Sequence, residues 1–374
     1  MSRHTAHGRA TPVVAVLAVI TLVVSACGAS DERRGPNARP AAVDDGATPA
    51  ATPPVPAPTP TRDASVTPGS IGAASTPPDE RTFAYDAARP LRAEVVSSSR
   101  RPGSRLERIR FDGADGERVP ALLALPSGGD GPSACVVLGH GFGADKHWGE
   151  IIDLLTRGGF GVFAIDARFH GERRDGRALE SVRADASVLA DMLRGTVIDM
   201  RRGIDYLASR PECDPTRVGY IGASMGGFIG ALLAGTDERV QAPILMVSGA
   251  DWRTMLESSI ADAFRRTASA DQIATAARVL APVDPVHWVG RIAPRPVLMI
   301  AGDADDVVPP ASARALHAAA NEPKTVLWYR GGHALPGRDE AQRVMLTVAG
   351  WLATHLGDDD DSLPGSPGRA TPGD

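Results

Sequence analysis

The apolar positions of this 374-residue chain gather into eight short runs between residues 106 and 329. The later runs are continuously apolar, as in strands covered on both faces, and stretches with helical spacing separate them. This alternation predicts an α/β fold with a mostly parallel eight-stranded sheet and helices on both faces. The predicted strands are Leu106–Phe111, Val119–Leu125, Ala134–Gly139, Gly161–Ile165, Arg217–Ile221, Pro243–Ser248, Pro296–Ala301 and Thr325–Tyr329.

The polar and glycine-rich segments between these runs predict the connections. The turn at residues 112–116 carries two glycines and predicts an antiparallel hairpin that opens the sheet. Two amphipathic runs within residues 252–294, after the sixth strand, predict a small helical lid. The other predicted helices are His147–Arg157, Ala184–Ala208, Met225–Ala234, Ala311–Ala320 and Asp339–His355.

The two ends of the chain lack this pattern. Residues 1–26 place two arginines before an apolar run too short to span a bilayer, which predicts an export signal. Residues 27–80 are rich in Ala, Pro and Thr and predict a disordered tether, and residues 358–374 predict a disordered acidic tail. The folded part is therefore predicted to be one domain over residues 81–357.

The end of the predicted signal, Val24-Ser25-Ala26-Cys27, resembles the lipobox of bacterial lipoproteins. That resemblance implies that Cys27 becomes acylated and anchors the protein at the extracytoplasmic face of the cell membrane. The alternative is an ordinary secretory signal in which this cysteine has no role.

The charge and composition of the chain exclude some classes of binding partner. The net charge is −5, and much of it comes from the tail, so the folded part has no basic face for nucleic acid. No Cys/His cluster has the spacing of a metal site. The sequence is silent on the oligomeric state.

The segment Gly222-Ala223-Ser224-Met225-Gly226 follows an apolar strand and precedes a helix rich in small residues. A serine on such a turn is held in a strained conformation that exposes its hydroxyl above the sheet. The pentapeptide alone is weak evidence in a chain with 40 glycines, but its position makes Ser224 the candidate nucleophile.

The order of the motifs resembles the α/β-hydrolase fold, closest to its esterase, dienelactone-hydrolase-like and prolyl-oligopeptidase-like members. A His-Gly pair follows the third predicted strand, and the serine turn follows the fifth strand. An aspartate follows the seventh strand, and a histidine follows the eighth strand. The resemblance covers residues 105–356 and implies a Ser-His-Asp triad without a cofactor.

Within this resemblance, His333 in a Gly-Gly-His loop is the predicted base. The run from Gly302 to Pro309 resembles the family pattern Gly-x-x-Asp-x-x-Val-Pro, which selects Asp305 as the acid, with Asp251 as the alternative. The backbone amides of Phe142 and Met225 are the implied oxyanion donors.

Other residues take secondary roles. Asp166–Arg173 resembles a loop of esterases with this fold, which implies that Asp166 and Arg168 brace the site. Lys146, His147 and Trp148 are candidates for lining the substrate pocket. Cys135 and Cys213 lie on strands that are neighbours in this fold, so they are either a disulfide or two buried thiols.

Together these residues predict a serine hydrolase that cleaves a small-molecule or lipid carboxylic ester through an acyl-enzyme. The alternative within the class is a serine peptidase of the prolyl-oligopeptidase type, which is disfavoured because only the tether precedes the predicted domain. A non-catalytic ligand-binding lipoprotein is the alternative from another class.

Overall fold

A computed structural model of the chain describes residues 79–128, 131–174, 185–257, 268–335 and 337–357. These residues all fall within one compact unit. The predicted signal, Cys27, nearly all of the predicted tether and the acidic tail lie outside the described residues. Among the described residues, none of the helices is both long enough and apolar enough to cross a bilayer.

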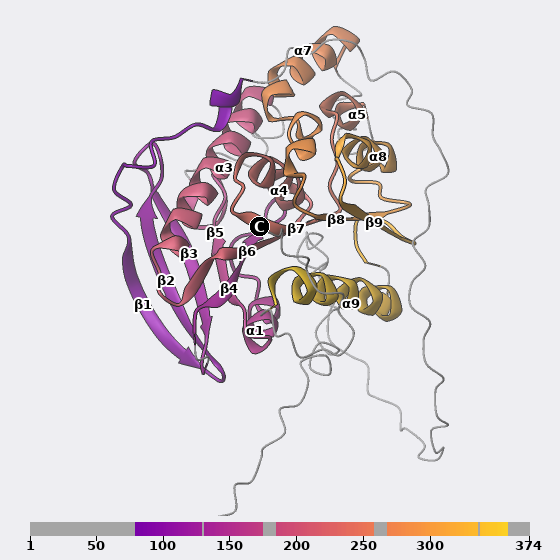
Figure 1. Ribbon diagram of the computed structural model, residues 1–374. Helices are drawn as coiled ribbons and strands as arrows, with labels where there is room; N and C mark the ends of the chain where they lie inside the picture. The colour runs from indigo at the N-terminus through magenta and orange to yellow at the C-terminus, as the bar shows by residue number, and fades with distance from the viewer. Residues whose placement is uncertain (1–78, 129–130, 175–184, 258–267, 336, 358–374) are drawn as a thin grey trace, which may run out of the picture. The chain divides into compact units, whose positions relative to one another are not determined.

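A single sheet runs through the described part of the chain in the order β1-β2-β3-β5-β4-β6-β7-β8-β9 (Figure 1). The first three strands are antiparallel to their neighbours, and the strands from β5 to β9 are parallel. The strands are β1 Glu94–Arg101, β2 Ser104–Asp112, β3 Arg118–Pro126, β4 Ser133–Gly139, β5 Gly161–Ile165, β6 Cys213–Ala223, β7 Val240–Met246, β8 Val297–Gly302 and β9 Lys324–Tyr329.

This sheet confirms the predicted fold class and corrects the number of strands. All eight predicted strands are present. The hairpin between β2 and β3 turns at residues 113–117, where the Gly113 carbonyl accepts a hydrogen bond from the N–H of Gly116. The additional strand is β1, at the antiparallel edge of the sheet. Every residue of β1 is exposed, so it has no apolar face that a sequence pattern could reveal.

Helices cover both faces of the sheet, as predicted. Figure 1 shows α1 and α9 on one face and α3, α4 and α8 on the other. Each face has its own buried apolar cluster, because the continuously apolar strands β4 to β8 present side chains to both sides. The helices are α1 Glu150–Arg157, α3 Ala186–Ala208, α4 Met225–Thr236, α8 Pro310–Ala319 and α9 Gly337–Leu356.

The described residues of the predicted lid segment, 252–294, are mostly helical. It contains α5 Trp252–Leu256, α7 Ala270–Leu280 and the 3-10 helices Ala281–Val283, Pro285–His287 and Val289–Ile292. Much of it packs into the core: Trp288 is 1% exposed and meets the ring of Phe83 edge to face at 5.0 Å. Residues 258–267, within the first predicted amphipathic run, lie outside the described residues.

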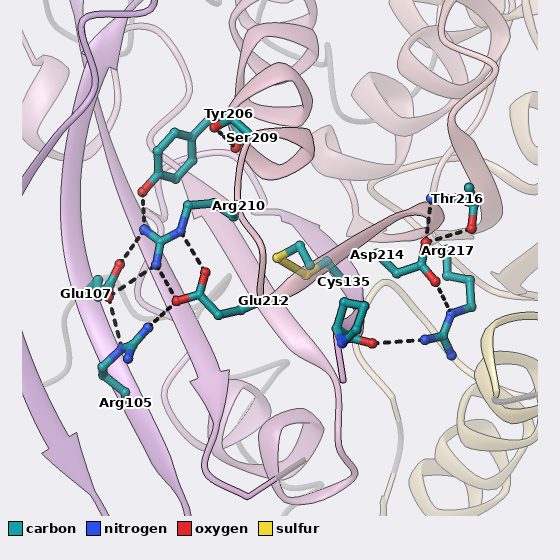
Figure 2. The surroundings of a disulfide bond; sticks show 12 residues. Arg105, Glu107, Cys135, Tyr206, Ser209, Arg210, Glu212, Asp214, Thr216 and Arg217 are labelled. Carbon is teal, nitrogen blue, oxygen red and sulfur yellow. Dashed lines mark hydrogen bonds and ion pairs between the residues drawn. A yellow bond between two sulfur atoms is a disulfide. The ribbon is translucent and has the colours of Figure 1, made fainter. Parts of the chain in front are cut away.

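A disulfide joins Cys135 in β4 to Cys213 at the start of β6, with the two Cα atoms 5.9 Å apart. Both residues are buried. Figure 2 shows that a network of charged groups lies beside it, in which the Arg210 guanidinium donates to Glu107 and Glu212. The Arg210 hydrogen bonds lower the pKa of Glu212 to about 2.

Candidate active site

Ser224 lies at the sharp turn between β6 and α4. Its backbone has φ 55° and ψ −122°, a conformation that is rare and strained for a residue with a side chain. Its N–H donates to the Met246 carbonyl of β7 at 2.9 Å, which ties the turn to the neighbouring strand. Ser224 is half-buried, and α4 begins at the next residue.

Glycines flanking Ser224 let the elements around this turn approach closely. A Cβ atom on Gly226 would collide with the carbonyl group of Gly139 at the end of β4. One on Gly222 would collide with the backbone of Gly226 in the first turn of α4. The Gly-x-Ser-x-Gly pattern therefore reflects the close packing of α4 on β4 and β6.

His333 and Asp305 are in direct contact. The His333 Nδ1 atom lies 2.9 Å from Oδ2 and 3.1 Å from Oδ1 of Asp305, so its N–H donates to that carboxylate. The Asp305 side chain is 2% exposed, and its Oδ1 accepts the backbone N–H groups of Val307 and Val308, each at 2.8 Å. This arrangement fixes the orientation of the imidazole and directs its Nε2 away from the aspartate.

Parallel strands bring these loops to one edge of the sheet. Ser224, Asp305 and His333 follow the carboxyl ends of β6, β8 and β9, and Gly302 at the end of β8 is paired with Tyr329 at the end of β9. In α/β sheets, ligands bind outside the carboxyl ends of the strands. The structure thus places the three predicted triad residues at the edge where this fold forms its sites.

Two residues that the sequence did not single out hold the His333 loop. Asp303 Oδ1 accepts the N–H of Gly331 at 2.9 Å, and the Tyr329 hydroxyl donates to the Gly332 carbonyl at 2.6 Å. The only sequence signal for Asp303 is that three of the four residues 303–306 are aspartates, and this pattern does not indicate which carboxylate binds the histidine.

Asp251, the alternative acid, has a different role in the structure. Its carboxylate caps α5, accepting the N–H groups of Arg253 and Thr254 and the Thr254 hydroxyl at 2.7 Å. Its own N–H donates to Asp284, whose pKa is raised by burial. The geometry therefore favours Asp305 over Asp251 as the partner of His333.

The predicted oxyanion donors lie on adjacent elements. Met225 is the first residue of α4, where backbone N–H groups have no partner within the helix. Phe142 lies in the loop after β4, and the pairing of Gly139 with Gly222 sets the start of that loop beside the serine turn.

His140 in this loop is structural. Its Nδ1 donates to the Gly141 carbonyl at 2.9 Å, and its Nε2 accepts the N–H of Ala167 at 3.0 Å. Burial lowers the pKa of His140, so the ring is neutral and both nitrogens are already engaged. This side chain links the predicted oxyanion loop to the segment after β5.

Lys146 forms a buried ion pair at the end of the same loop. Its Nζ lies 2.6 Å from Asp166 and 2.7 Å from Glu172, and its backbone N–H donates to Asp166 at 2.9 Å. The Lys146 side chain is 2% exposed. Lys146 thus acts as an internal brace, which differs from the pocket-lining role considered for it from the sequence.

The arginines after β5 also brace the structure. Arg168 and Arg173 both bind the fully buried carboxylate of Asp199 in α3, at 3.1 and 2.8 Å. Asp166 and Arg168 therefore have the bracing contacts that the resemblance implied. Within the described residues, no group of three or more His, Cys, Asp or Glu side chains is arranged to hold a metal ion.

Comparison with known proteins places the chain in a family. Residues 149–359, more than half of the chain, match the model of the prolyl oligopeptidase family. The chain belongs to the prolyl oligopeptidase family. It is also 29% identical over 189 residues to the protein YtaP of Bacillus subtilis (strain 168), covering 46% of this chain and 63% of YtaP.

Solved structures of two kinds share the fold. Acetyl xylan esterase 1 from Thermoanaerobacterium sp. JW/SL YS485 aligns with a TM-score of 0.61 and 23% identity, over 72% of this chain and 91% of that one. A prolyl endopeptidase aligns with a TM-score of 0.55 and 19% identity, over 68% of this chain and 39% of that one. These likenesses agree with the α/β-hydrolase fold seen in the sheet order.

Proposed function

We propose that this member of the prolyl oligopeptidase family is a serine hydrolase that cleaves a carboxylic ester through an acyl-enzyme. The observation that carries the proposal is the hydrogen bond from His333 Nδ1 to the buried Asp305, at the sheet edge where Ser224 occupies its strained turn. A histidine oriented in this way can accept the proton of a serine hydroxyl. Family membership supports a hydrolase independently of this geometry.

In the proposed reaction, the Ser224 oxygen attacks the ester carbonyl carbon while the hydroxyl proton moves to His333 Nε2. The carbonyl oxygen becomes an oxyanion that accepts hydrogen bonds from the amides of Met225 and Phe142. The carbon–oxygen bond to the alcohol then breaks, and the alcohol leaves with the proton from His333. A water molecule repeats the sequence on the acyl-enzyme, which releases the acid and restores Ser224.

Peptide hydrolysis is the second candidate, because the matching family is named for an oligopeptidase. The same three residues can cleave an amide, whose nitrogen needs protonation before it can leave. The two candidates therefore differ in substrate class and share the catalytic residues.

The test uses a fluorophosphonate probe and two substrate panels, p-nitrophenyl esters of short acids and aminoacyl p-nitroanilides. We expect labelling of the wild-type protein, faster turnover of the esters, and loss of labelling and turnover in Ser224→Ala. Ser97→Ala, on the exposed strand β1, is the matched control and should behave as wild type. Faster turnover of anilides would favour the peptidase, and a wild-type protein that resists the probe would favour a binding protein.

We also propose that Cys27 carries a lipid anchor that holds the enzyme at the extracytoplasmic face of the cell membrane. The proposal rests on the sequence, where Val24-Ser25-Ala26-Cys27 follows an apolar run. More than one acyl chain is needed for stable attachment, at about 0.8 kcal/mol for each buried methylene group. Metabolic labelling with an alkyne fatty acid should mark the wild-type protein and not Cys27→Ser, and equal labelling would refute the anchor.

A further inference from the structure

The imidazole of His170 is buried beneath the predicted oxyanion loop without serving the triad. His170 follows β5 and is 0% exposed. Its Nδ1 donates to the Arg168 carbonyl at 2.8 Å, which fixes the plane of the ring. Its Nε2 has no hydrogen-bond partner among the described residues. Burial lowers the pKa of His170 to about 4, so the ring is uncharged at neutral pH and behaves as an aromatic surface.

Two rings of the oxyanion loop contact this surface. The ring of Phe142 meets the His170 ring edge to face, with centroids 5.2 Å apart and planes at 85°. The His140 ring lies 5.2 Å from His170 at an interplanar angle of 52°. Edge-to-face contact is the preferred geometry of such pairs and adds to the stabilisation from burial alone.

The loop needs this support because of its composition. Phe142 stands between Gly141 and Gly143, and Gly143 has φ +85°. Glycine leaves the backbone free to rotate, so the direction of the Phe142 N–H depends on what holds its side chain. His140 fixes the start of the loop and Lys146 its end, while His170 contacts its centre.

We infer that His170 is a positioning residue whose ring holds the Phe142 side chain, so that the Phe142 amide points at the developing oxyanion. The inference rests on the proposed function, because an oxyanion donor has meaning only in an acyl-transfer enzyme. His170 does not touch the reacting atoms in this arrangement. A hydrogen-bond donor that is oriented before the reaction stabilises the transition state more strongly than it stabilises the bound substrate. Loss of this orientation should therefore lower kcat and leave KM nearly unchanged.

Two substitutions separate the ring from the hydrogen bond. His170→Asn can still donate to the Arg168 carbonyl but has no ring, and we expect kcat for a p-nitrophenyl ester to fall about 3- to 10-fold with KM nearly unchanged. His170→Phe keeps the ring and loses the donor, and its kcat should stay within about twofold of wild type. Affinity for a boronic acid, which mimics the tetrahedral intermediate, should fall in His170→Asn by the same factor as kcat.

Phe142→Leu removes the aromatic partner and leaves His170 in place. It should lower kcat about as much as His170→Asn, and the double variant should be no slower than either, because both changes break one contact. If His170→Asn does not fold, the kcat of Phe142→Leu alone tests the inference. A wild-type kcat in Phe142→Leu, or equal losses in His170→Asn and His170→Phe, would overturn the inference.

The controls keep this inference apart from the proposed function. Thermal unfolding of each variant shows whether a loss of kcat reflects a loss of folded protein. If the wild-type protein does not react with the fluorophosphonate probe, the proposed function fails. If the wild-type protein reacts and turns over esters while His170→Asn and Phe142→Leu have the same kcat as wild type, only the role of His170 is refuted.

Discussion

At the scale of single residues, Asp303 and Asp305 stand two positions apart in one loop and bind different groups. Asp305 is buried and accepts the imidazole N–H of His333, while Asp303 is exposed and accepts the backbone N–H of Gly331. The first contact orients the proposed base, and the second holds the loop that carries it. The same substitution at the two positions therefore separates these roles.

We expect Asp305→Asn to lower kcat roughly 1,000- to 10,000-fold, because an amide no longer stabilises the imidazolium or fixes its tautomer. Asp303→Asn keeps an oxygen acceptor for the N–H of Gly331, so its kcat should fall by less than about tenfold. Steady-state hydrolysis of a p-nitrophenyl ester by the two purified variants provides the measurement. Equal effects at both positions would contradict the assignment of Asp305.

The sequence predicted Ser224, Asp305 and His333 as a set because the motifs after their strands resemble, in order, those of the α/β-hydrolase fold. It could not predict that Lys146 and Asp166 form a buried pair, because nothing in the pattern around a lysine identifies which of the 45 acidic residues it meets. Such partners are set by tertiary packing. Burial of Lys146 reverses the usual expectation that a lysine lies in solvent.

At the scale of elements, the close approach of α4 to β4 depends on glycine. Gly226→Ala would drive a methyl group into the Gly139 carbonyl, and backbone atoms there cannot move without separating the helix from the sheet. Gly350 in α9 has open space around its Cα and is exposed. These two positions offer the same substitution with opposite expected results.

We expect Gly226→Ala to destabilise the protein by about 3 kcal/mol or more, and Gly350→Ala to stabilise it by about 0.5–1 kcal/mol. The second effect arises because alanine loses less backbone entropy on entering a helix. Urea unfolding followed by circular dichroism measures both. A Gly226→Ala protein as stable as wild type would show that the serine turn has more room than the structure indicates.

The disulfide joins β4 and β6, the two strands that lead into the predicted oxyanion loop and the serine turn. It closes a loop with a sequence separation of 78 residues, which restricts the unfolded chain. In the chain-entropy description this is worth roughly 4 kcal/mol, so Cys135→Ala/Cys213→Ala should be less stable by about that amount in urea. Thiol titration of the unfolded wild-type protein should find two more thiols after reduction, and an unchanged count would refute the bridge.

The sequence predicted the strands whose burial requires a run of apolar residues, and it did not predict the exposed strand β1. The strands β4, β5, β7 and β8 and residues 218–222 of β6 are largely buried on both faces, and their continuous apolar runs indicated both their position and their parallel arrangement. The strand β1 reads Glu-Val-Val-Ser-Ser-Ser-Arg-Arg and is fully exposed. It is a strand because β2 offers it backbone partners, a contact that no local pattern encodes.

At the scale of the whole molecule, buried histidines make stability depend on pH. Burial and the nearby Lys324 and Arg314 lower the pKa of His317 from 6.5 to about 4. Between these values the unfolded chain binds a proton at this ring and the folded chain does not. Stability is therefore fully present above about pH 6.5 and falls as the pH decreases toward 4. His170 acts in the same direction.

We expect the free energy of unfolding to fall by about 2 kcal/mol between pH 7.5 and pH 5 on account of His317 alone. His317→Phe keeps a ring against Trp328, which His317 meets edge to face at 5.3 Å, and removes the titrating group. The variant should lose correspondingly less stability than wild type over this range, measured by urea unfolding at both pH values. An identical loss in the two proteins would contradict this account.

The buried position of the Cys135–Cys213 bridge also determines how the protein has to be produced. Sulfur atoms enclosed between β4 and β6 are out of reach of oxidants once the sheet has closed, so the bond has to form while the chain is still folding. Expression in a host compartment that oxidises thiols should therefore give a homogeneous product, whereas cytoplasmic expression would trap the reduced form and air oxidation after purification would not repair it.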